Sequence, residues 1–256
     1  MKILRLLALG WLLHLKMLSR SAFDGLLGVI WPLFFATTAF FMFQAGAEPS
    51  VLVYASLGAS VLGVWSATAV AASSALQRER WQGTLELLVA APTHFSLVLL
   101  PITIAMATIG LYAMAATFFW GRFLFGINVH VEHPFLFVLA VPATIVSIGM
   151  LGFLLSVTVV RYRTAWALGN AFEYPVWLVC GFLVPISLLP DWVRPISWAL
   201  APTWGIRAIR ESALGGSPLP DIGACLGLGL GCAVLGVLLV ETVLRSARRH
   251  ASLSLT

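Results

Sequence analysis

The chain has 256 residues, of which 60% are hydrophobic and only 10% are charged, and its mean hydropathy is +0.98. Soluble domains carry about 25% charged residues, so this composition excludes an ordinary soluble globular protein and indicates an integral membrane protein. The formal net charge of +5 comes from basic residues that lie between apolar runs. We interpret this charge as a membrane-orientation signal and expect no binding of nucleic acid.

Residues 1–22 predict a helix that lies in the membrane surface. The uncharged stretch over 6–15 is too short to cross a bilayer, which takes about 20 apolar residues. On a helix, the basic side chains fall in a sector about 60° wide beside a broad Leu and Trp face. They are Lys2, Arg5, Lys16 and Arg20. A cleaved signal peptide is the alternative, but the late basic residues and the lack of an Ala-x-Ala-like site argue against it.

Long apolar runs predict six transmembrane helices in a single all-α domain over 1–256. The runs lie at about 25–47, 50–76, 97–120, 134–160, 164–187 and 222–244. Each is long enough to cross the hydrocarbon core. Helices are expected because lipid offers no hydrogen-bond partner for an unpaired backbone.

The distribution of Lys and Arg predicts the orientation of these spans. Six spans place both ends of the chain on one side, and the side richer in basic residues faces the cytoplasm. The basic residues that fall on the opposite face are Arg122, Arg194, Arg207 and Arg210. We therefore expect a multi-pass protein of the cytoplasmic (inner) membrane with both termini in the cytoplasm.

A charged segment, residues 77–95, breaks the apolar pattern on the cytoplasmic side. Its sequence from Gln77 to Pro92 is QRERWQGTLELLVAAP. The second span is expected to continue as a helix past Gln77, and Gly83 suits the left-handed position beyond its end. Thr84 suits the N-cap of a new short amphipathic helix, with Glu86 in its first turn. The residues singled out in this segment are Arg78, Glu79, Arg80, Gly83, Thr84, Glu86 and Leu87.

The fifth run contains the one charge well inside a span, Glu173. An ionisable side chain at that depth is costly and marks a candidate functional site. Asn170 lies one helical turn earlier, and with Tyr174 these residues are candidates for lining a substrate pathway. The alternative is a structural role for the carboxylate, in a hydrogen bond or in a pair with arginines at the end of the span.

Residues 185–220 form the longest connection and are expected on the outer side. Prolines cut the stretch into pieces too short to span, and tryptophans favour the membrane interface. We expect short interfacial or re-entrant helices that cap the outer end of the bundle, and an ordinary loop is the alternative. The residues singled out here are Pro190, Trp192 and Pro202.

The last span carries three glycines four residues apart: Gly223, Gly227 and Gly231. Small residues at this spacing let two helix backbones approach closely. The partner could belong to the same subunit or to a second copy, and the spacing leaves both open.

No residue set points to catalysis or to a metal ion. Cys180, Cys225 and Cys232 lack redox or metal-binding spacing and are interpreted as packing residues. His130 and His133 do not make a complete ligand set. We expect no catalytic residue and no metal site.

Two motifs resemble those of ABC-2-type exporter permeases. The first is Glu79, Gly83-Thr84, Glu86-Leu87-Leu88 and Ala91-Pro92, which resembles E-x-x-x-G-T-x-E-x-L-x-x-x-P in that family. The second is Leu189-Pro190-Asp191-Trp192 with Ala201-Pro202-Thr203, which resembles the family's Leu-Pro-x-Trp and downstream Pro-Thr/Leu. The layout is similar too, most of all to the small permeases of daunorubicin-resistance and nodulation-factor exporters.

The resemblance implies that residues 77–95 are a coupling helix that docks onto a separate P-loop ATPase. It also implies a dimer, with a second copy or a paralogue, that exports a drug, lipid or glycoconjugate. The chain itself has no P-loop because neither lysine follows a glycine. We therefore expect no cofactor on this chain, no ATPase activity of its own, and ATP with Mg²⁺ on the partner.

Two other classes are the alternatives. A six-span intramembrane enzyme would need a Ser–His pair or a carboxylate cluster at bilayer depth, and the spans contain neither. A secondary transporter would commonly show internal repeats, and none is obvious.

Overall fold

The structure is a computed structural model that describes residues 2–20, 30, 33–38, 40–41, 49–81, 83, 94–127, 130–159 and 165–250. Within these ranges every regular element is a helix, which confirms the all-α prediction. The elements are α1 (Lys2–Ser19), α3 (Pro49–Trp81), α5 (Ser96–Phe125), α6 (Pro134–Val159), α7 (Ala165–Val179), η1 (Ile186–Leu188), η2 (Asp191–Val193), α8 (Arg194–Trp198), α9 (Ala201–Leu214) and α10 (Pro218–His250).

Three of the described helices are long and apolar enough to cross a membrane. They are α5 over Ser96–Phe125, α6 over Pro134–Val157 and α10 over Pro218–Val240. A helix of 30 residues measures about 45 Å, against about 30 Å of hydrocarbon core. A membrane location follows. The full set of six spans stays a prediction, and most of the first expected span lies outside the described residues.

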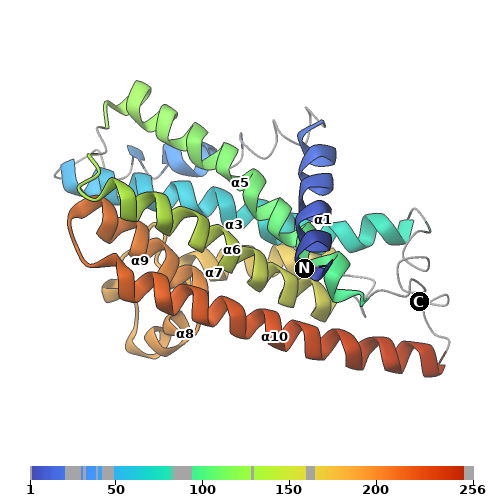
Figure 1. Ribbon diagram of the computed structural model, residues 1–256. Helices are drawn as coiled ribbons and strands as arrows, with labels where there is room; N and C mark the ends of the chain where they lie inside the picture. Colours follow the sequence, from blue (N-terminus) through green and yellow to red (C-terminus); the bar gives the residue numbers. More distant parts are fainter. Residues whose placement is uncertain are drawn as a thin grey trace.

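The long helices run along one another, and α1 lies across them (Figure 1). The indole N–H of Trp11 in α1 donates to the Thr108 hydroxyl in α5, at 3.1 Å. A Cβ at Gly10 would lie 3.2 Å from the Pro101 ring, so α1 sits close against α5. α1 thus crosses α5, and its location in the membrane surface stays a prediction.

Small residues set the close contacts inside the bundle. A Cβ at Gly110 of α5 would lie 2.6 Å from the Cα of Val64 in α3. A Cβ at Gly229 of α10 would lie 3.0 Å from the Cα of Ser147 in α6. These glycines therefore allow backbones to approach to a distance that a side chain would prevent.

The glycine stripe on α10 faces away from these contacts. A Cβ at each of its positions would meet no atom within 4 Å. The stripe consists of Gly223, Gly227 and Gly231, and all three are exposed. The interpretation that the stripe serves packing within the subunit therefore finds no support in the described part of the chain.

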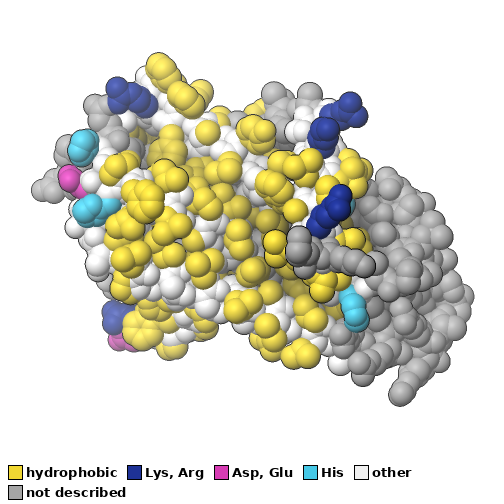
Figure 2. Space-filling model, in the orientation of Figure 1, with side chains coloured by type: hydrophobic (Ala, Val, Ile, Leu, Met, Phe, Trp, Pro, Cys, Tyr) yellow, Lys and Arg dark blue, Asp and Glu magenta, His cyan; other side chains and the backbone are white. Residues whose placement is uncertain are grey.

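The visible face of the molecule carries apolar side chains between charged residues that gather toward its two ends (Figure 2). The most exposed large apolar side chains on the long helices include Phe119, Phe123, Val138, Leu230 and Leu238. Such a surface is unfavourable in water and suits contact with lipid. The buried core lies between the helices and includes Trp65, Ile148 and Ile206.

Candidate functional site

The charged end of α3 has the conformation that the sequence predicts. The helix continues through Arg78, Glu79 and Arg80 and ends at Trp81. Gly83 has φ +70°, which confirms the left-handed position beyond the helix end. At 33 residues α3 is about 50 Å long, which exceeds the hydrocarbon core by about 20 Å.

The rest of the predicted coupling segment cannot be compared with the structure. Thr84, Glu86 and Leu87 lie outside the described residues. The amphipathic helix and its coupling role therefore stay predictions.

Glu173 lies on α7 against α3, and its side chain is buried. The Ser66 side chain of α3 lies beside its carboxyl group. The indole N–H of Trp65 donates to the backbone carbonyl of Glu173, at 3.2 Å. We call this contact of Trp65, Ser66 and Glu173 the α3–α7 seam. The seam provides the polar partner that a carboxyl group needs away from water, and it lies within one subunit.

The side chain of the neighbouring Tyr174 lies in a different environment. Its side chain is 45% exposed, and its ring lies 6.3 Å from Phe35 and 6.5 Å from Trp177, centroid to centroid. Asn170 lies in α7 as predicted, but its side chain is outside the described part of the chain. Glu173 and Tyr174 are therefore not brought together as one polar surface: Glu173 faces α3, whereas the exposed Tyr174 lies against Phe35 and Trp177.

α7 ends earlier than the predicted span over 164–187. Gly181 has φ +76°, and its N–H bonds to the Leu178 carbonyl at 3.2 Å. The N–H of Phe182 bonds to the Trp177 carbonyl, also at 3.2 Å, which completes a Schellman turn. The described helix has 15 residues, or about 22 Å, and is shorter than the hydrocarbon core.

The turn after α7 is held by Arg210 of α9. One guanidinium nitrogen of Arg210 donates to the Gly181 carbonyl at 2.8 Å. The other donates to the Phe182 carbonyl and, at 3.3 Å, to the Tyr54 carbonyl of α3. The guanidinium also lies 3.3 Å above the Tyr54 ring centroid. We call Arg210, Tyr54, Gly181 and Phe182 the Arg210 clamp.

The clamp offsets the cost of a buried charge without using a carboxylate. Arg210 is only 6% exposed, and burial lowers its pKa to about 10, which leaves it protonated at neutral pH. Carbonyl oxygens, the negative end of the α7 dipole and the face of an aromatic ring all favour a cation. Gly58 of α3 is required beside the clamp, because a Cβ there would lie 1.5 Å from the Phe182 carbonyl oxygen.

The sequence pattern did not predict this clamp. Arg210 was expected only as one of the charges on the outer side of the membrane. Two features of the sequence pointed toward the clamp. Gly58 is a glycine within a predicted span, and Arg210 follows Arg207 by three residues. Neither signal identifies the partners, because backbone carbonyls can belong to any residue type.

We call residues 185–220 the predicted outer segment. Up to Leu214 it forms short helices, as its prolines predict. Pro190 precedes η2, and Pro202 lies buried in the first turn of α9. Trp192 is 71% exposed. The Ser197 hydroxyl of α8 donates to the Val179 carbonyl, which ties α8 to the end of α7.

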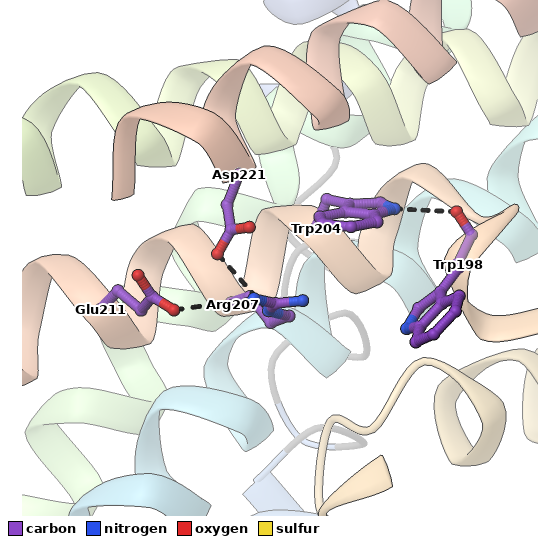
Figure 3. Close-up of polar contacts among 5 residues, drawn as sticks. All are labelled: Trp198, Trp204, Arg207, Glu211 and Asp221. Atoms are coloured by element: carbon purple, nitrogen blue, oxygen red, sulfur yellow. Dashed lines mark hydrogen bonds and ion pairs between the residues drawn. The ribbon is translucent and has the colours of Figure 1, made fainter. Parts of the chain in front are cut away.

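A second polar group joins α9 to α10 (Figure 3). Arg207 Nε lies 3.4 Å from a carboxylate oxygen of Asp221, and a guanidinium nitrogen lies 3.8 Å from Glu211. The same guanidinium lies 5.0 Å from the Trp204 ring centroid. That Asp221 oxygen has no hydrogen bond of good geometry, so the contact with Arg207 is an ion pair only. Trp204 in turn donates to the Trp198 carbonyl at 2.8 Å.

The described residues contain no group of three or more His, Cys, Asp or Glu side chains that could hold a metal ion. Cys180 and Cys225 are fully buried, in line with a packing role.

One comparison with known proteins identifies a family. The family model described as "ABC-2 type transporter" matches residues 59–214, which run from the middle of α3 to the end of α9. The match includes the seam, Arg210 with the turn after α7, and residues 185–214 of the predicted outer segment. No curated protein matches the sequence.

Proposed function

The chain belongs to the ABC-2 type transporter family, and from this premise we propose that it is the permease subunit of an ATP-driven exporter. Its ATPase is a separate P-loop protein that holds ATP and Mg²⁺. The permease pairs with a second permease, either a copy or a paralogue, in the cytoplasmic membrane. The proposed substrate class is hydrophobic or amphipathic: a drug, a lipid or a glycoconjugate.

The continuity of α3 is the observation that carries this proposal. One helix runs from Tyr54, in the Arg210 clamp, past the α3–α7 seam to the charged turn over 78–80. Gly83 then turns the chain in a left-handed conformation. A segment that such a turn holds at an angle to α3 suits docking against another protein. A loop that only reverses the direction of the chain would not need this turn. A force applied to residues 77–95 would act directly on this helix.

The aromatic side chains of Tyr174 and Trp177 on α7, with Phe35 beside them, support the proposed substrate class. Tyr174 is exposed and lies against the half-buried rings of Phe35 and Trp177, so this surface is largely apolar but carries a hydroxyl group. Such a surface favours molecules with both apolar and polar parts. In the proposed cycle, closure of the ATPase on ATP tilts α3, and substrate passes between the two permeases and leaves past the outer segment.

Co-purification with a P-loop ATPase tests the assignment. The permease is expressed with its ATPase, extracted in mild detergent and reconstituted in liposomes. We expect a stable complex whose ATP hydrolysis exceeds that of the ATPase alone. A permease that purifies alone, with no effect on hydrolysis, would contradict the proposal.

A further inference from the structure

Three elements meet at one side chain in the Arg210 clamp. α9 supplies the guanidinium, α3 supplies the carbonyl and ring of Tyr54, and the turn after α7 supplies the carbonyls of Gly181 and Phe182. Among the described residues no carboxylate forms an ion pair with Arg210. A buried arginine on one element whose partners come from two others fixes the positions of all three relative to one another.

The guanidinium group suits this task in a way that an ammonium group does not. Its planar fork presents several N–H donors in fixed directions and stacks on an aromatic face. A lysine could keep the charge, but it could not reach the three carbonyls while lying over Tyr54. The substitution Arg210→Lys therefore separates geometry from charge.

The other contacts of α9 lead to different helices. Gly205 packs against Thr144 of α6, and Arg207 pairs with Asp221 of α10. The α3–α7 seam joins α3 to α7 without involving α9. Within the described ranges, the clamp is thus the polar connection between α3 and the outer helices.

We propose that Arg210 is a positioning residue that fastens the turn after α7 and α9 to α3, so that movement of α3 reaches the outer segment through this side chain. The inference rests on the proposed function, because the movement originates at residues 77–95 when the ATPase closes. Arg210 acts on transport only through the helices that it holds, and it touches no substrate.

Hydrogen–deuterium exchange of the permease–ATPase complex in lipid nanodiscs tests this role. Exchange is compared between the nucleotide-free complex and the complex trapped with Mg²⁺, ATP and vanadate. Exchange is followed in two peptides, which are residues 77–83 at the end of α3 and residues 186–200 in the outer segment. In the wild type we expect trapping to change exchange in both peptides, by at least about fivefold in the outer one.

The variant Arg210→Lys should keep the response at 77–83 and reduce the response at 186–200 to less than about twofold. Tyr54→Leu removes the ring but keeps the backbone carbonyl, so it should reduce the outer response partly. The Tyr54→Leu variant also tests the proposal if Arg210→Lys fails to assemble with the ATPase. Arg207→Lys, on the exposed side of the same helix, is the matched control and should respond as the wild type does.

Two results would overturn the inference and leave the proposed function intact. One is a full outer response in both Arg210→Lys and Tyr54→Leu. The other is a wild-type response at 77–83 with none at 186–200. A wild type that shows no nucleotide response in either peptide would instead overturn the proposed function, and the inference with it.

Discussion

Two arginines one turn apart on α9 are stabilised in different ways. Arg207 is partly exposed and pairs with carboxylates, as a charged side chain at a surface commonly does. Arg210 is buried and is held by backbone carbonyls and an aromatic ring. The sequence could place both on one face of the membrane by counting spans. The sequence could not show that the two arginines are stabilised differently. Tyr54 lies 156 residues from Arg210, and a backbone carbonyl has no sequence signature.

At the residue scale, Glu173→Gln tests whether the carboxylate serves the transport pathway. Glutamine has nearly the same shape and keeps a polar group beside Ser66, so the free energy of unfolding should change by less than about 0.5 kcal/mol. If the carboxylate serves the pathway, transport should fall by roughly tenfold, which corresponds to the loss of one contact of about 1.4 kcal/mol. Thermal unfolding in detergent and efflux from cells measure the two quantities. Unchanged efflux with unchanged stability would assign Glu173 a structural role in the seam.

At the element scale, the parts that sequence reasoning predicted are those with local signals. The proline spacing predicted short outer helices, and Gly83 predicted a left-handed turn after α3. The early end of α7 was not predicted, because the apolar run continues beyond it to Val184. What ends the helix is the Schellman turn at Gly181, stabilised by contacts from distant helices.

The packing of α3 against the clamp makes a quantitative prediction for Gly58→Ala. The added Cβ would lie 1.5 Å from the Phe182 carbonyl oxygen and 2.6 Å from the Arg210 guanidinium. The turn must therefore move away from α3, at a cost of about 3 kcal/mol or more. The midpoint of thermal unfolding should fall by about 6 °C or more.

Gly227→Ala is the matched control, since a Cβ there meets no described atom within 4 Å. Its unfolding midpoint should stay within about 2 °C of the wild type. Equal effects of the two substitutions would show that the close contact at Gly58 does not matter for stability.

At the scale of the whole molecule, α1, the C-terminal end of α3 and the C-terminal end of α10 lie toward one end of the bundle, and α8 and α9 lie at the other (Figure 1). The predicted topology places the first of these ends in the cytoplasm. The three long apolar helices were predictable from hydropathy. The side of the membrane on which each connection lies can be measured by chemical labelling.

Single cysteines supply that measurement. Gly216→Cys, in the exposed connection between α9 and α10, should react with a membrane-impermeant thiol reagent added to intact cells. Gln82→Cys, beyond the end of α3, should react only after the membrane is opened. The reverse pattern would invert the orientation and remove the basis for docking a cytoplasmic ATPase at residues 77–95.

The central claim is that residues 77–95 connect an ATPase to α3, and Gly83→Val tests it most directly. Valine resists the left-handed conformation by about 1–2 kcal/mol, so the segment after Gly83 should lose its angle to α3. Gly126→Val is the matched control. Gly126 is also left-handed, with φ +64°, and follows α5 at the opposite end of the bundle.

The measurement is co-purification with the ATPase, together with ATP hydrolysis by the reconstituted complex. We predict that Gly83→Val inserts normally but loses the ATPase or its stimulated hydrolysis, whereas Gly126→Val retains both. Wild-type binding and hydrolysis in Gly83→Val, or equal losses in the two variants, would contradict the claim that this segment couples the ATPase to the permease.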